Sequence, residues 1–125
     1  MEWEEALCRR LLADVTVGQR AGYGPRPQNV PLPWISLKVV SDPAVQILKK
    51  FQDRRQSRVQ VDVRAETRAD VIALRKAVIA ALAPGGLFHG ITFGRANFTP
   101  VRDLGEPTET GFVHRDSFDV MVWHD

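Results

Sequence analysis

Residues 58–66 have the sequence RVQVDVRAE, in which apolar and polar side chains alternate at every position. On a strand, the apolar residues Val59, Val61, Val63 and Ala65 face one side and the polar residues face the other. This pattern predicts a sheet with one dry face and a second face that meets water or a partner.

An amphipathic helix is expected directly after this strand. Thr67 is predicted to cap it, because Asp70 follows three residues later in an approximate capping box. The apolar residues recur at helical spacing and define the buried face: Val71, Leu74, Val78 and Leu82. The basic residues are expected on the solvated side: Arg68, Arg75 and Lys76. Proline and glycine at positions 84–86 end the helix.

A first helix is predicted at the N-terminus, where Trp3, Leu7 and Leu11 recur every fourth residue. The chain then becomes rich in glycine and proline from Gly18 to Pro33. Proline removes a backbone donor and disfavours helix in the preceding residue. This segment is therefore expected to be a long surface loop with little regular structure.

Further strands are predicted on both sides of the 58–66 strand. Residues 34–40 alternate, and residues 90–98 are expected to form one strand that bends at Gly94 and continues toward Val101. Residues 103–110 are expected to be an acidic turn. Residues 111–124 form the last strand, which is apolar on both faces and is therefore expected to be central or covered by a partner. Residues 44–57 stay open between a hairpin arm, a short helix and a mobile loop.

Together these elements indicate the α+β class. We expect one domain over residues 1–125, with a mostly antiparallel sheet and two helices packed on one face. The composition, 44% hydrophobic and 26% charged, excludes disorder, and no apolar run is long enough to span a membrane. An acidic N-terminus argues against a secretory signal. Cys8 is the single cysteine, so no intrachain disulfide forms. The net charge of +2 is too small to indicate nucleic-acid binding by itself.

No catalytic, cofactor or metal site is predicted from the sequence. The histidines His89, His114 and His124 lack metal-ligand spacing and are expected to be unrelated surface or strand-end residues. Asp116 and Asp119 differ by three positions, so on a strand they face opposite sides.

A basic cluster is the one sequence feature that suggests an interface. It contains Lys49, Lys50, Arg54, Arg55 and Arg58. Such a cluster is either a solvated loop or a surface for phosphate or an acidic partner. An acidic counterpart lies further along the chain: Asp103, Glu106 and Glu109. In a closed ring the basic arm of one subunit would meet the acidic loop of its neighbour, and we take these eight residues as the candidate interface with a protein partner.

Several stretches, taken in order, resemble a known family. They are EEAL at 4–7, LLAD at 11–14, PLPWI at 31–35, RVQVDV at 58–63, the helix at 70–82 and FDVMVWH at 118–124. The set covers nearly the whole chain and is similar to the small tail-completion, or tail-terminator, proteins of long-tailed phages, prophages and gene transfer agents.

The resemblance implies a structural assembly protein rather than an enzyme, with no cofactor. Such proteins form a ring, usually hexameric, at the head-proximal end of the tail tube in the virion, after assembly in the bacterial cytoplasm. The implied partners are further copies of the chain, the tail tube protein and the head-side connector or stopper. DNA passes through the ring without sequence-specific binding, and no membrane is involved.

Other functions stay open at this point. A head-side stopper or neck adaptor would contact portal-proximal proteins instead of the tube. A small nucleic-acid-binding module would use the basic residues 49–58. An enzyme with a site distributed over distant segments is a further alternative.

Overall fold

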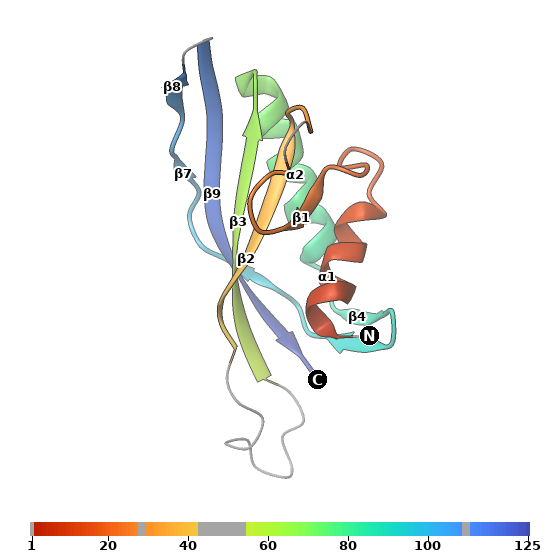
Figure 1. Cartoon of the computed structure of the whole chain (residues 1–125). Coiled ribbons are helices and arrows are strands. Elements are labelled where there is room, and N and C mark those ends of the chain that lie inside the picture. Colours follow the sequence, from red (N-terminus) through yellow and green to blue (C-terminus); the bar gives the residue numbers. More distant parts are fainter. Residues whose placement is uncertain (1, 28–29, 43–54, 109–110) are drawn as a thin grey trace.

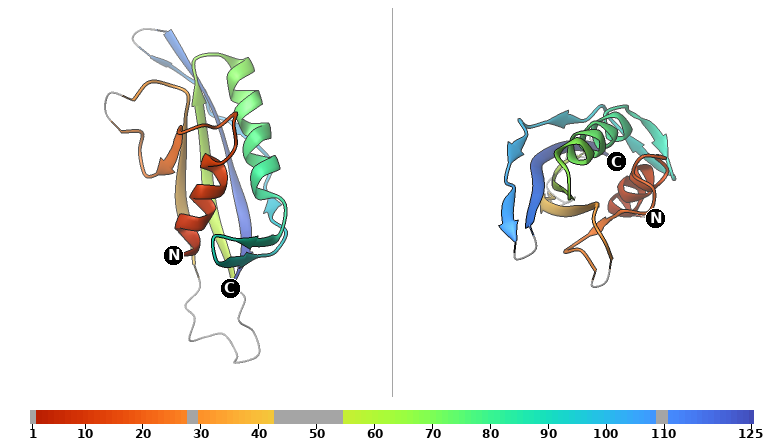
Figure 2. Two further views of the ribbon diagram at one scale, coloured as in Figure 1. Left: turned by 90° about the vertical axis from the view of Figure 1, so that its right-hand side faces the viewer. Right: turned by 90° about the horizontal axis from the view of Figure 1, so that it is seen from above.

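The computed structural model describes residues 2–27, 30–42, 55–108 and 111–125. They form one curved sheet and two helices, and both helices pack on the same face of the sheet (Figure 1). Seen from above, the strands make an arc around the helices (Figure 2). The α+β class and the mostly antiparallel sheet are thereby confirmed.

The sheet is built around two long strands, β3 (Arg55–Ala65) and β9 (Gly111–His124), which pair antiparallel along the whole of β3. On the far side of β3 lie β2 (Trp34–Ser41) and the short β1 (Ala21–Tyr23), which pairs parallel to β2. On the far side of β9 lie β4 (Gly86–Phe88), β5 (Ile91–Phe93), β6 (Asn97–Phe98), β7 (Arg102–Asp103) and β8 (Glu106–Thr108). The last strand is therefore central, as its two apolar faces predicted.

Both predicted helices are present. Helix α1 covers Trp3–Leu12 and α2 covers Arg68–Leu82. Thr67 caps α2, because its hydroxyl oxygen accepts a hydrogen bond from the backbone N–H of Asp70 at 3.1 Å. Neither helix is long and apolar enough to cross a membrane, as far as the described residues show.

The hydrophobic core lies between the helices and the inner face of the sheet. The alternating residues Val59, Val61 and Val63 have no exposed surface. They pack with α1, α2 and β9 through Trp3, Leu7, Leu11, Leu74, Val78, Leu82, Phe118, Val120 and Val122. The buried faces predicted for the helices and for β3 are thereby confirmed.

Arg10 is a charged residue within this packing, with only 6% of its surface exposed. It donates to the carbonyl oxygens of Ala81 at 3.0 Å and of Pro84 at 2.7 Å, at the C-terminal end of α2. Its guanidinium carbon lies 3.9 Å from the centre of the Phe88 ring. A cation at the C-terminal end of a helix donates hydrogen bonds to the terminal carbonyls and interacts favourably with the helix dipole. Arg10 therefore joins α1 to α2.

The described part of residues 18–33 has little regular structure, as expected, apart from the short strand β1 that pairs with β2. Two other expectations about irregular segments were wrong. Residues 90–98 form two short strands instead of one, because the backbone N–H of Gly94 donates to the carbonyl of Trp123 and interrupts the register. The acidic 103–110 segment contributes to β7 and β8. Both short strands form through backbone pairing with the long strand β9.

The segment whose structure the sequence left open lies mostly outside the described residues. Residues 43–54 are not described, and β3 begins at Arg55. Its first residues, 55–57, pair with the end of β9.

Candidate assembly surface

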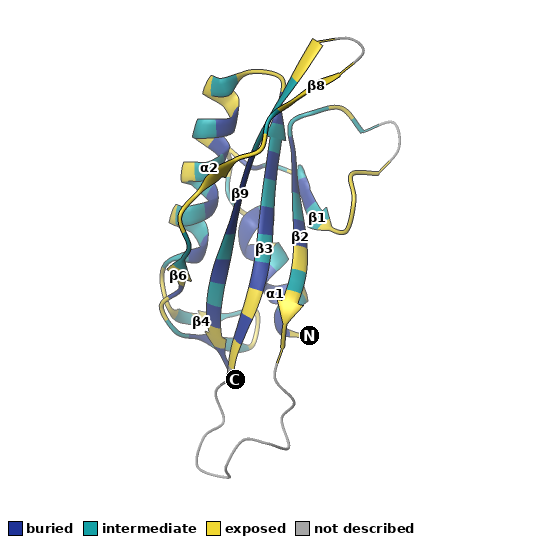
Figure 3. Ribbon diagram, turned by 90° about the vertical axis from the view of Figure 1, so that its left-hand side faces the viewer, coloured by how far each residue is buried: buried dark blue, intermediate teal, exposed yellow. Residues whose placement is uncertain are grey.

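The face of the sheet that points away from the helices is lined with charged side chains. Figure 3 shows this face, with β9, β3 and β2 side by side. Two ion pairs run diagonally between β3 and β9. Arg58 Nε lies 2.5 Å from Asp119 Oδ2, and Arg115 Nη2 lies 3.1 Å from Asp62 Oδ2. Such cross-strand pairs fix the register of the two central strands from the outer side.

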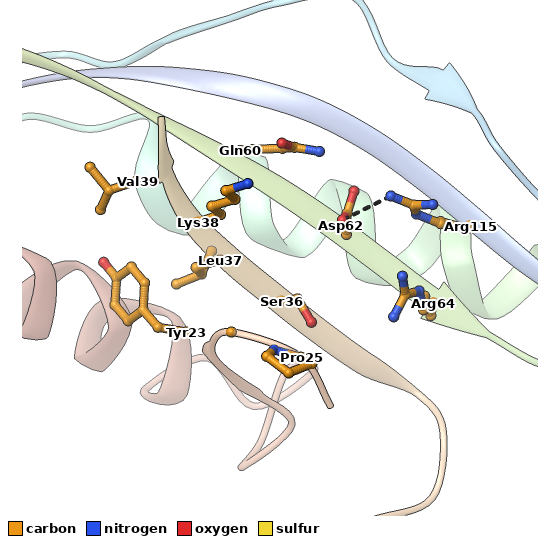
Figure 4. A pocket seen from close by; sticks show the side chains of 11 residues that line it. Tyr23, Pro25, Ser36, Leu37, Lys38, Val39, Gln60, Asp62, Arg64 and Arg115 are labelled. Atoms are coloured by element: carbon orange, nitrogen blue, oxygen red, sulfur yellow. Dashed lines mark hydrogen bonds and ion pairs between the residues drawn. The ribbon is translucent and has the colours of Figure 1, made fainter. Parts of the chain in front are cut away.

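A groove of about 650 Å³ crosses this outer face beside the residues that follow β1 (Figure 4). Its charged lining residues are Lys38, Arg64, Arg115 and Asp62, so three positive charges face one negative charge. Asp62 pairs with Arg115, whereas Lys38 and Arg64 form no ion pair with any described residue. The groove is therefore a site of uncompensated positive charge.

Several polar atoms in this groove are buried without a hydrogen bond to the described part of the chain. They are Ser36 Oγ, Asp62 Oδ1 and Arg115 Nε. A buried polar atom without a partner costs roughly 1–3 kcal/mol, and native proteins rarely leave several together. These three atoms all lie on the outer side of the sheet, where the described part of the chain leaves them without a partner.

The opposite edge of the sheet exposes acidic side chains next to the arginines Arg95 and Arg102. Asp103 in β7 has 63% of its side-chain surface exposed, and Glu106 in β8 is also exposed. Pro107 lies between Glu106 and Thr108, and a proline prevents continuous strand pairing at a sheet edge. This edge therefore presents acidic side chains instead of an open backbone ladder.

A buried carboxylate fastens α2 to the sheet. Asp116 in β9 has no exposed side-chain surface and lies 2.6 Å from Arg68 Nη1 and 2.8 Å from Arg75 Nη1. The hydrogen bond to Asp116 raises the pKa of Arg68. Arg68 and Arg75 were expected on a solvated helix face. Arg75 is instead half-buried, since Asp116 lies on the inner side of β9 and draws both guanidinium groups toward the sheet. Asp119 lies on the outer side of β9, so the prediction that Asp116 and Asp119 face opposite sides of the strand is confirmed.

One histidine lies at the end of a strand, as the sequence allowed, but is not at the surface. His124 ends β9 but is wholly buried, and its ring stacks on Trp3 with centroids 4.3 Å apart. Its Nε2 lies 2.8 Å from Ser57 Oγ, and that hydroxyl donates to Asp42 Oδ1 at 2.7 Å.

A serine, a histidine and an aspartate thus adjoin one another, although no sequence motif indicates it. In a hydrolytic triad the carboxylate accepts a hydrogen bond from the imidazole and orients it, whereas here the Asp42 carboxylate accepts one from the serine hydroxyl. Ser57 is also wholly buried. The arrangement therefore joins the ends of α1, β2, β3 and β9, and acts as a structural contact.

The structure places only part of the interface that the sequence suggested. Lys49, Lys50, Arg54 and Glu109 lie outside the described residues, and the side chain of Arg55 is not described. Arg58 pairs with Asp119 of its own chain. Asp103 and Glu106 lie at the sheet edge beyond β9. An interface that involves these residues therefore stays a prediction.

Comparison with known families agrees with these observations. A family model described as "Tail completion protein gp17" matches residues 5–125 of the chain. The chain belongs to this family. It is therefore a structural component of a phage-type tail, and the resemblance found in the sequence is confirmed. The family is one of tail structural proteins and is not a class of enzymes.

A solved structure shares the fold of this tail completion protein. A chain of the structure described as "Virion of native gene transfer agent (GTA) particle" aligns with a TM-score of 0.65 and 18% sequence identity. The alignment covers 98% of this chain and 93% of that chain. No curated protein sequence matches the chain significantly.

Metal-ligand side chains are not grouped in the described part of this tail completion protein. No set of three or more histidine, cysteine, aspartate or glutamate residues there is arranged to hold a metal ion.

Proposed function

We propose that this tail completion protein forms a closed ring on the head-proximal end of the tail tube. The ring ends tube growth and joins the tail to the head-side connector. In this proposal the chain acts as one domain over residues 1–125 and carries out no catalysis. Its partners are further copies of itself, most simply as a hexamer, the tail tube protein and the connector or stopper protein, and DNA passes through the ring without sequence-specific contacts.

The proposal rests on a difference in charged groups between the two edges of the sheet. One edge ends in the short β1, next to a positively charged groove, and the other ends in the segments β4–β8 with exposed acidic residues. Two unlike surfaces on one subunit suit a head-to-tail contact, and such contacts generate rings when the rotation closes. Membership of the tail completion family supports a place for this ring on a phage-type tail.

The basic residues that the sequence singled out also belong to the proposal. Lys49, Lys50 and Arg54 precede β3 in the sequence, and Arg55 begins β3 opposite the end of β9. We assign this end to contact with the neighbouring subunit or with the tube. Arg58, already paired with Asp119, would hold β3 and β9 in register beneath that contact.

Electron microscopy of the purified protein, alone and mixed with tail tubes, tests the proposal. We expect closed rings of one diameter in the free protein, and density at one end of each tube in the mixture. Binding along the sides of tubes would contradict a terminating role. Binding to isolated heads but not to tubes would favour a stopper or neck adaptor.

A further inference from the structure

We propose that the groove on the outer face of β2 and β3 receives the acidic β8 edge of a neighbouring copy, with Arg64 of one subunit paired to Glu106 of the next. The proposal rests on the ring described above and names the contact that closes it.

Charge is the first argument for this occupant. Lys38 and Arg64 have no ion-pair partner in the described part of the chain, and Arg115 leaves its Nε without a hydrogen bond. Figure 4 shows Arg64 and Arg115 next to each other, beyond Ser36 at the side of the groove. A carboxylate placed among them would neutralise charge and accept hydrogen bonds from guanidinium groups.

The position of Glu106 is the second argument. The register of β8 on β9 pairs Glu106 with Val113. Asp116 and Phe118 are buried on the inner face of β9. Successive side chains on a strand point to opposite faces, so Val113 and Arg115 both lie on the outer face. Asp103, in contrast, is opposite Asp116 and contacts Arg68 on the inner side. Of these two acidic residues, Glu106 is thus the one on the face that carries the groove, at the other edge of the sheet.

Hydrogen-bond chemistry favours a protein segment over the phosphates of DNA. Asp62 Oδ1 in the groove is a buried acceptor without a donor. A phosphodiester carries no donor for this oxygen. The β8 segment supplies both kinds of group, since Thr108 lies two residues beyond Glu106 on the same face. Its hydroxyl can donate to Asp62 while the Glu106 carboxylate accepts from Arg64.

A charge-swap experiment tests the pairing. Four proteins are compared with the wild type by sedimentation velocity over a concentration series: Arg64→Glu, Glu106→Arg, the double variant with both changes, and Lys76→Glu. Lys76 is an exposed base of α2 on the helix side and serves as the matched control. Arg64 has no partner within the described chain, so its reversal is expected to leave the fold intact, and circular dichroism checks this.

Each single reversal is expected to raise the protein concentration needed for ring assembly by about tenfold or more, because like charges then face each other across the contact. The double variant should recover most of the loss, and Lys76→Glu should assemble like the wild type. Rings unaffected by either single reversal would overturn the groove contact while leaving the ring itself intact. A wild type that stays monomeric with and without tubes would instead overturn the ring.

Two further experiments distinguish the β8 edge from other molecules or segments that could fill or replace this contact. If Glu106→Arg is rescued by reversing Arg54 and Arg55 instead of Arg64, the acidic edge meets the basic arm and the groove proposal is wrong. If Arg64→Glu leaves the rings intact but abolishes salt-dependent retention of a short DNA duplex, the occupant is nucleic acid and the proposal is again overturned.

Discussion

Arg75 Nη1 lies 2.8 Å from Oδ2 of Asp116, a carboxylate with no exposed side-chain surface. Arg68 contacts the other oxygen of the same group, so one buried anion in β9 holds two cations from α2. This relationship fastens α2 to the sheet.

Replacement of this carboxylate is predicted to be strongly destabilising. Asp116→Asn should lower the free energy of unfolding by clearly more than the loss of an exposed ion pair does, because two guanidinium groups lose the charge on which they converge. Urea unfolding followed by circular dichroism measures this. Glu5→Gln is the control, since Glu5 and Arg9 form an ion pair with both side chains about half exposed and should contribute less than about 1 kcal/mol. Equal losses in the two variants would contradict the structural role given to Asp116.

The contact between the helices gives a second prediction. Arg10→Met keeps the length of the side chain but removes two hydrogen bonds to the end of α2 and the cation over Phe88. We expect the free energy of unfolding to fall by about 2–3 kcal/mol. Arg9→Met changes an exposed neighbour and should cost far less. The account would be in error if both variants unfolded at the same urea concentration.

The single cysteine allows a prediction about reactivity. Burial raises the pKa of the Cys8 thiol, so less thiolate forms near neutral pH than in an open chain. Because the thiolate is the nucleophile, alkylation of the folded protein by iodoacetamide at pH 8 should be about tenfold slower than in urea. Mass spectrometry of timed samples gives both rates. Equal rates would show that Cys8 is as open in the fold as in the unfolded chain.

The single tyrosine predicts how stability changes at alkaline pH. The Tyr23 hydroxyl donates to the carbonyl oxygen of Glu4 at 2.8 Å, and desolvation there raises the phenol pKa. Below about pH 10 the phenol is neutral in both the folded and the unfolded chain. Above that pH the unfolded chain ionises first, so folding stability contributed by Tyr23 is present below about pH 10 and lost as the pH rises further.

Tyrosinate absorbance reads this group alone, since the chain has one tyrosine. We expect its titration midpoint to lie above pH 10 in the native protein, and Tyr23→Phe to lose less stability than the wild type between pH 9 and pH 11. A midpoint at the ordinary tyrosine value, with identical pH profiles, would contradict the effect of burial.

Long periodic segments are the part of this fold that the sequence predicts well. The alternation around Val61 and the helical spacing from Val71 to Leu82 each extend over many residues, so β3 and α2 follow from local pattern. The strands β4–β8 do not, because each has only two or three residues and exists through pairing with β9. No local signal distinguishes such segments from turns.

The candidate surface was predictable in part. The polar positions of β3, including Asp62 and Arg64, indicated a face that meets water or a partner, and this is the side that carries the groove. The contribution of Arg115 could not be foreseen, because it depends on the register between β3 and β9. The contacts of His124 with Ser57 and Trp3 are equally hidden, since they join residues far apart in the sequence.

The central claim is that the protein ends tube growth by capping one end. The most direct measurement is the length distribution of tubes that assemble from purified tail tube protein, with and without this protein present during elongation. Capping predicts that tubes stop lengthening once the protein is added, with one ring on the arrested end and no effect of Lys76→Glu. Tubes that grow equally long with the protein present, or carry it along their sides, would contradict the claim.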